Sequence, residues 1–196
     1  MKDMNKKLSF ILYNYNDYNN KIEYEYRLNE AFRGGKLSRD YLRGYEWKYI
    51  KLYRKFQANK NNIWGKVYKR KIKRFENKTG FSFESNPSFG NGLIIGHWGK
   101  IVINREAKFG NDIFLTHGVT VGRDIRGKRA GVPTFGNRIC IRTNSTVVGA
   151  INIGNDVLIA PNTFVNFDVP DHSVVIGNPA TIHYRENATE GHIPEL

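Results

Sequence analysis

Cysteine and long apolar runs are scarce in this chain of 196 residues. Its single cysteine, Cys140, excludes a disulfide framework and a cysteine-rich zinc site. No run approaches the roughly 18 apolar residues of a membrane span, which excludes an integral membrane protein. The first residues hold too short an apolar stretch for a secretory signal and no small-residue cleavage site. We therefore expect a cytoplasmic protein.

Positive charge is concentrated in the first part of the chain. Residues 1–80 hold 21 Lys and Arg against 8 Asp and Glu, whereas residues 81–196 carry no net charge. Ten of the eleven tyrosines also precede residue 81. This change predicts a basic, tyrosine-rich region over 1–80, a second domain over 81–182 and a tail over 183–196. The tail has no repeat, and we expect it to be poorly ordered or to pack on a neighbour.

The first region has helical patterns. Apolar residues at steps of three and four predict helices over 38–57, with Ser38 as N-cap, and over 62–76. A shorter helix is expected over 20–33, ending at Gly34-Gly35. The Lys and Arg residues fall mostly between the apolar positions, so two interpretations stay open: a solvated surface, or a cationic surface for an anionic acceptor or a peripheral membrane contact. No nucleic-acid motif is present, and we expect no nucleic-acid partner.

The second region contains a six-residue repeat. Twelve apolar residues follow this period: Phe89, Ile95, Ile103, Phe109, Leu115, Val121, Phe135, Ile141, Val147, Ile153, Ile159 and Val165. A helix cannot produce this pattern, because six residues do not return to the same helical face. A glycine often follows the apolar residue, as Gly90, Gly110 and Gly136 do.

A triangular coil explains the period. Each six-residue unit supplies a short strand and a corner, three units close a turn, and the apolar residue points inward. We expect about four turns, with glycines at the corners in positive-φ conformations. Two segments depart from the period: His97-Trp98-Gly99 adds two residues, and 123–134 forms an excursion. Insertions in repeat proteins form loops that often carry function.

The repeat resembles that of the left-handed β-helix acyltransferases, and its order resembles the serine acetyltransferase branch. The segments that carry this resemblance are GLIIGHWGKIVINREAKFGNDIFLTHGVTVG, PTFGNRICI and GAINIGNDVLIAPNTFVNFDVPDHSVVIGNPA. It implies a mainly β fold, a left-handed parallel β-helix preceded by a small helical region. It also implies a homotrimer that binds acetyl-CoA as co-substrate, without a metal, in the groove between neighbouring β-helices.

The resemblance assigns a histidine base. His97 matches the family's catalytic histidine, and a neutral imidazole can remove the proton of an attacking hydroxyl. His117 is expected either in the same cleft or as a structural histidine. Trp98 is expected to contact substrate or only to cover the coil edge. The family's aspartate partner would fall at Ser82, so Glu84 is the expected alternative for orienting the imidazole.

Six residues are expected to contact the coenzyme: Lys128, Arg129, Arg142, Ala160, Asn178 and Pro179. The three cations suit its phosphates, although solvated surface is the competing interpretation of each. Ala160 and the Asn178-Pro179-Ala180 turn match coenzyme-lining segments of the family.

The expected acceptor is inferred from a position at which this chain differs from the family pattern. The family's second active-site histidine precedes a proline in the excursion, whereas this chain has Gly131-Val132-Pro133. We therefore expect acetyl transfer to a hydroxyl of a sugar, surface polysaccharide or precursor, for instance an anionic glycan. The alternatives are a serine O-acetyltransferase of cysteine biosynthesis and a non-catalytic β-helix that binds a partner.

Overall fold

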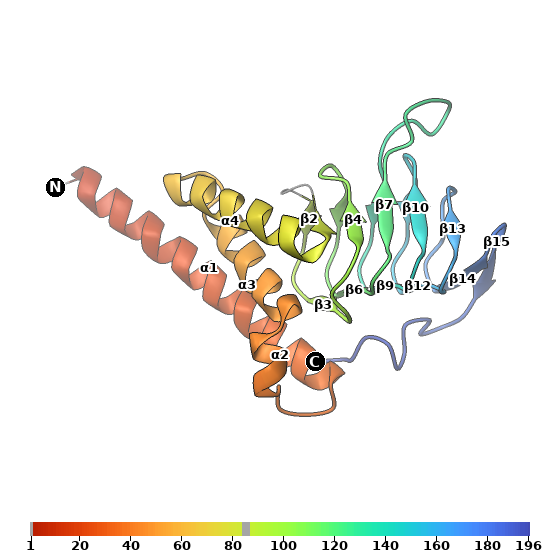
Figure 1. Cartoon of the computed structure of the whole chain (residues 1–196), viewed down its shortest axis with the longest axis horizontal. Coiled ribbons are helices and arrows are strands. Elements are labelled where there is room, and N and C mark those ends of the chain that lie inside the picture. Colours follow the sequence, from red (N-terminus) through yellow and green to blue (C-terminus); the bar gives the residue numbers. More distant parts are fainter. Residues whose placement is uncertain (1, 84–86) are drawn as a thin grey trace.

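Helices gather at one end of the molecule, and the β-coils stack away from them (Figure 1). The computed structural model describes residues 2–83 and 87–196, with side chains described from Asp17 onward. The helices are α1 (Lys2–Phe32), α2 (Arg39–Arg43), α3 (Tyr45–Ala58) and α4 (Ile63–Thr79). None of the described helices is long and apolar enough to cross a membrane.

The helices differ from the prediction in their bounds. The first is much longer than 20–33, although it ends as expected before Gly34 and Gly35, which have positive φ. The helix expected over 38–57 is interrupted at Gly44, whose extended backbone caps both α2 and α3. The Ser38 cap is confirmed, because its side chain accepts a hydrogen bond from the Tyr41 N–H.

Three sheets run along the sides of the coil. The five-stranded sheet contains β1 (Phe81–Ser82), β4 (Ile101–Ile103), β7 (Thr120–Gly122), β10 (Thr146–Val148) and β13 (Phe164–Val165). The four-stranded sheet contains β2 (Ser88–Phe89), β5 (Lys108–Phe109), β8 (Thr134–Phe135) and β11 (Asn152–Ile153). The six-stranded sheet contains β3 (Leu93–Ile95), β6 (Ile113–Leu115), β9 (Ile139–Ile141), β12 (Val157–Ile159), β14 (Ser173–Gly177) and β15 (Ala180–Tyr184).

The expected left-handed parallel β-helix is confirmed, with about five turns instead of four. Neighbouring strands pair in parallel except β14 and β15, which form an antiparallel hairpin at the far end. All twelve periodic apolar residues are buried. In the four-stranded sheet, the rings of Phe89, Phe109 and Phe135 stack with 4.4 Å between successive centroids. The six-residue period therefore corresponds to rows of inward side chains in register.

The corners bend differently from the prediction. Gly90, Gly110 and Gly136 do not have positive φ. They are needed because the next coil passes close: a Cβ at Gly136 would lie 2.7 Å from the Gly154 carbonyl oxygen. The positive φ angles occur two residues later, at Asp112 for example. The expected location of the left-handed residues is therefore wrong.

A buried ion pair joins the helices to the first coil. The side chains of Glu25 and Arg54 are fully buried, and Arg54 Nε donates to Glu25 Oε1 over 2.8 Å. Glu25 also accepts from the N–H groups of Gly92 and Leu93, while Arg54 donates to the Gly90 carbonyl. These bonds connect α1, α3 and the segment before β3. They fix the position of α3 against the coil.

The C-terminal tail folds back on its own chain. Residues 185–196 return toward the helical end (Figure 1). The Asp156 carboxylate accepts from the N–H groups of Ala188 and Thr189, from the Thr189 hydroxyl and from His172 Nδ1. The tail is therefore ordered by its own β-helix. The expectation of a poorly ordered or intermolecular tail does not match this packing.

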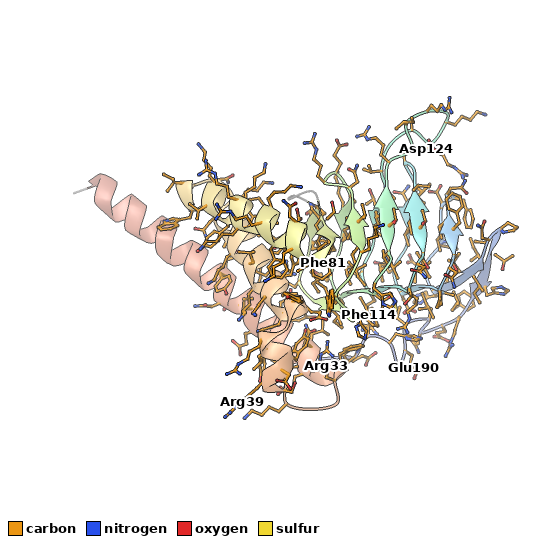
Figure 2. The ribbon with its side chains drawn as sticks, viewed as in Figure 1. Arg33, Arg39, Phe81, Phe114, Asp124 and Glu190 are labelled. Atoms are coloured by element: carbon orange, nitrogen blue, oxygen red, sulfur yellow. The ribbon has the colours of Figure 1, made fainter. Side chains whose placement is uncertain are left out.

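The outer face of the six-stranded sheet is apolar and covered. Its buried outward side chains are Ile94, Phe114, Cys140 and Leu158. Leu28 and Phe32 of α1 and Ile193 of the tail pack on them. Phe114 marks this face in Figure 2. The inward period does not predict this second apolar row, because it depends on segments that are distant in sequence.

We expect Arg54→Met to destabilise the protein strongly, because it leaves the Glu25 carboxylate buried without its charge partner. The loss in the free energy of unfolding should be about 3–5 kcal/mol, measured by urea denaturation. Lys21→Met is the matched control, since Lys21 pairs with the partly exposed Asp17. This variant should lose less than about 1 kcal/mol. Equal losses in the two variants would contradict the importance of the buried pair.

We expect Asp156 to stabilise the tail in a pH-dependent way. Burial alone would raise the pKa of Asp156, but the hydrogen bonds from Thr189, His172 and Ala188 lower it to about 2. A carboxyl whose pKa is lowered by folding stabilises the native state above its unfolded pKa and loses this effect as pH falls. Asp156→Asn should therefore cost about 2 kcal/mol near pH 7 and about half of that at pH 3, measured by urea denaturation. A cost independent of pH over this interval would contradict the assignment.

Candidate active site

Two histidines face each other at one corner of the coil. His97 follows β3, and His117 follows β6 at the equivalent position, because Ile95 pairs with Leu115. Their ring centroids lie 5.8 Å apart, and the rings are nearly perpendicular. Both side chains are exposed. The structure therefore brings together the two expected histidines at what we call the histidine corner, residues 96–100, 116–119 and 142–145.

The strand register of the next coil adds further side chains to this corner. Thr143 follows β9 at the position equivalent to His117, since Leu115 pairs with Ile141. The Thr116 hydroxyl is 3.2 Å from the Thr143 hydroxyl. Two hydroxyl side chains thus lie beside the histidines. Neither threonine was expected at this corner, although the repeat places both of them there.

Arg142 and Ala160 continue a second row of this corner. They occupy the position after Ile141 and Ile159 that Gly96 occupies after Ile95. The Arg142 guanidinium carbon lies 5.4 Å from the centroid of the Phe114 ring. The arginine thus packs on the outer face of the six-stranded sheet. Arg142 and Ala160, two of the six residues expected to bind the coenzyme, therefore lie on the same corner as the histidines.

Trp98 is held by α3. Its backbone N–H donates to Glu46 Oε1 over 2.9 Å, and its ring packs edge-on against Tyr45 with centroids 5.6 Å apart. The indole remains about half exposed, at 53%. The helical region therefore reaches the histidine corner. Tyr45 and Glu46 were not expected there, because no periodic signal links them to residue 98.

The excursion projects from the coil at a different corner. It leaves β7 and rejoins at β8, and Asp124 marks its base in Figure 2. Asp124 and Gly131 bond each other through two backbone hydrogen bonds. Lys128 and Arg129 are exposed on this loop, and the Arg129 guanidinium donates to the Asn166 carbonyl. These two cations thus follow the five-stranded sheet, whereas the histidines follow the six-stranded sheet.

The remaining expected residues lie elsewhere. Asn178 and Pro179 form the exposed turn of the hairpin between β14 and β15, at the far end of the coil. Ser82, the position of the missing aspartate, is half-buried in β1 and pairs with Val102. Glu84, the expected orienting residue, lies outside the described residues.

Other chemistry is not supported by the described residues. Burial raises the pKa of the Cys140 thiol to about 12, so it is not a nucleophile near neutral pH. Within 17–83 and 87–196, no three His, Cys, Asp or Glu side chains converge in a way that could hold a metal ion. The exposed imidazoles of His97 and His117 are thus the candidate acid–base groups of this corner.

The repeat and the parallel β-helix are similar to those of hexapeptide-repeat acyltransferases. Within that class the chain is similar to serine acetyltransferases, which confirms the resemblance predicted from the sequence. The enzyme of Helicobacter pylori is 36% identical over 102 residues, covering 52% of this chain and 60% of that protein. That of Mycobacterium tuberculosis is 36% identical over 106 residues, covering 53% and 45%.

Solved structures support the fold. A serine acetyltransferase of Neisseria gonorrhoeae superposes with a TM-score of 0.74 at 23% identity, covering 86% of this chain and 65% of that one. No protein-family model matches the chain. The chain spans about three-fifths of the length of the Helicobacter relative and less than half of the Mycobacterium one.

The expected sugar or polysaccharide acceptor is wrong. The relatives reported above are serine acetyltransferases, which agrees with the alternative. The prediction relied on a missing histidine at Gly131-Val132-Pro133. A missing side chain identifies no new acceptor, because neighbouring segments can supply other polar groups to the same cleft.

Proposed function

We propose that this chain is an acetyl-CoA-dependent O-acetyltransferase with L-serine as acceptor. The observation that carries the proposal is the His97–His117 pair, on successive coils of a β-helix that is similar in sequence to serine acetyltransferases. A hydroxyl attacks a thioester slowly unless its proton is removed as it attacks. A neutral imidazole at an exposed corner provides such a base.

In the proposed reaction, one imidazole nitrogen of His97 accepts the serine hydroxyl proton while the oxygen attacks the acetyl carbonyl carbon. The carbon–sulfur bond then breaks, and the imidazolium returns the proton to the leaving thiolate. The products are O-acetylserine and coenzyme A, and no other reactant is consumed. His117, with its ring 5.8 Å away, is proposed to contact the acceptor or the developing oxyanion.

Several segments of the chain would contact the bound coenzyme. Ala160 and Arg142 are proposed to line the bound molecule beside the histidine corner, with Arg142 near a phosphate. Lys128 and Arg129, exposed on the excursion, are proposed to reach a phosphate from the other side. Asn178 and Pro179 are proposed to contact the adenosine half from the hairpin.

A homotrimer is part of this proposal. The histidines are exposed in a single chain, so a neighbouring copy would be needed to exclude water from the reaction. The excursion of that copy would supply Lys128 and Arg129 to the same groove.

Within each chain, Trp98 is proposed to form the wall of the acceptor side. A monomer at micromolar concentration in analytical ultracentrifugation would contradict a shared site.

The activity is tested with purified protein, acetyl-CoA and L-serine, following release of free thiol. We expect thiol release that depends on serine and is absent with L-alanine, which lacks the hydroxyl. Equal release with both amino acids would contradict transfer to the serine hydroxyl. Tight binding of CoA without release for serine would favour the non-catalytic alternative.

We expect His97→Ala to lower kcat by about a hundred- to ten-thousand-fold, because the general base is lost. His183→Ala is the matched control, since His183 is an exposed histidine of β15 and should keep wild-type kcat. Circular dichroism of both variants checks the fold. Unchanged turnover in His97→Ala would overturn the assignment of the base.

A further inference from the structure

The exposed face of α4 carries cations without a compensating acid on the same helix. Its basic face, as we define it, comprises Lys66, Lys69, Arg70, Lys71, Lys73, Arg74 and Lys78. The one acid of α4, Glu76, is buried and turned inward, where it accepts from the Phe83 N–H over 3.1 Å and contacts the Tyr49 hydroxyl. Figure 2 shows nitrogen-tipped side chains projecting from this helix. Seven of the 21 Lys and Arg residues of the first 80 positions thus lie on the exposed surface of this one helix.

Two shallow grooves follow this surface. One, of about 400 Å³, is lined by Lys66, Lys69, Arg70 and Lys73. The other, of about 300 Å³, lies between α3 and α4 and is lined by Lys48, Lys51, Leu52, Lys55, Tyr68, Lys71 and Phe75. Burial and the charges of Lys55 and Lys48 lower the pKa of Lys51, which indicates crowded positive charge. Both grooves suit anionic groups at the surface of a larger partner.

Apolar side chains accompany the cations. Ile63 and Trp64, in the first turn of α4, are 74% and 58% exposed. Ile63, Val67, Arg70 and Arg74 are spaced by four, three and four residues, so they follow one stripe along the helix. Exposed tryptophan beside lysine and arginine is typical of helices that lie in the interface of a membrane.

We propose that the basic face of α4, together with the lysines of α3, binds the surface of an anionic lipid bilayer. Ile63 and Trp64 insert at the boundary between headgroups and acyl chains, while the cations contact the phosphates of the lipids. The positive charge of this face favours an anionic bilayer as its binding partner. A second copy docked by twofold symmetry would place the same cations against each other. The proposal is independent of the reaction at the histidine corner.

The test is sedimentation of the full chain with vesicles. One set contains phosphatidylcholine alone, and the other contains equimolar phosphatidylcholine and phosphatidylglycerol. We expect binding only to the anionic vesicles and a decrease with added salt, because salt screens the attraction. A fourfold variant, Lys66→Gln with Lys69→Gln, Arg70→Gln and Lys73→Gln, should weaken binding by more than about a hundredfold.

The matched control removes the same charge from positions around α2 and in β5. It combines Lys36→Gln, Arg39→Gln, Arg43→Gln and Lys108→Gln, all at exposed positions away from α4, and should keep most of the binding. A second pair compares two exposed tryptophans. Trp64→Ala should weaken binding at least about fivefold, whereas Trp98→Ala should not.

Several results would overturn the proposal. They are absence of binding to anionic vesicles, equal binding to both vesicle types, and equal losses in the two fourfold variants. Tighter binding to a DNA duplex at the same salt, lost in the α4 variant, would reassign the surface to nucleic acid. A change of oligomeric state confined to that variant would reassign it to a second copy. Acetyl transfer is measured separately, and its failure would leave the vesicle result intact.

Discussion

Stacking of inward apolar side chains at strand spacing is the constraint on which the structure depends. Parallel strands lie about 4.8 Å apart, so each coil must place its buried residue directly over the previous one. The Phe89, Phe109 and Phe135 rings meet this condition with centroids 4.4 Å apart. Because the rows are in register, residues at equal distance past the inward residue also align. This is how His97, His117 and Thr143 come to share one corner.

The buried Glu25–Arg54 pair connects this stack with the helices. It bonds to the backbone at Gly90, Gly92 and Leu93, at the start of β3. The same helix that carries Arg54 begins with Tyr45 and Glu46, which hold Trp98. The helical region therefore shapes the histidine corner as well as covering the end of the coil.

The error about the acceptor has a physical cause. The six-residue repeat identifies the coil and the corner, but substrate specificity in enzymes depends on polar side chains that converge from several segments. Tyr45 and Glu46 reach the corner although no periodic signal predicts it, and the expected acceptor rested only on Gly131-Val132-Pro133 and Ser82. One absent histidine was therefore too little to define a substrate class.

Periodicity by itself determined the coil, its inward rows and the excursion over 123–134, since each depends on residues related by a fixed local spacing. It left open whether His117 joins His97 or is structural, and the three-dimensional structure placed the two rings 5.8 Å apart. The Ser38 cap was equally local. Only the tertiary structure decided that Asp156 holds the tail and that α1 covers Ile94 and Phe114. These features arise from contacts between segments far apart in the chain, and such contacts leave no periodic trace in the sequence.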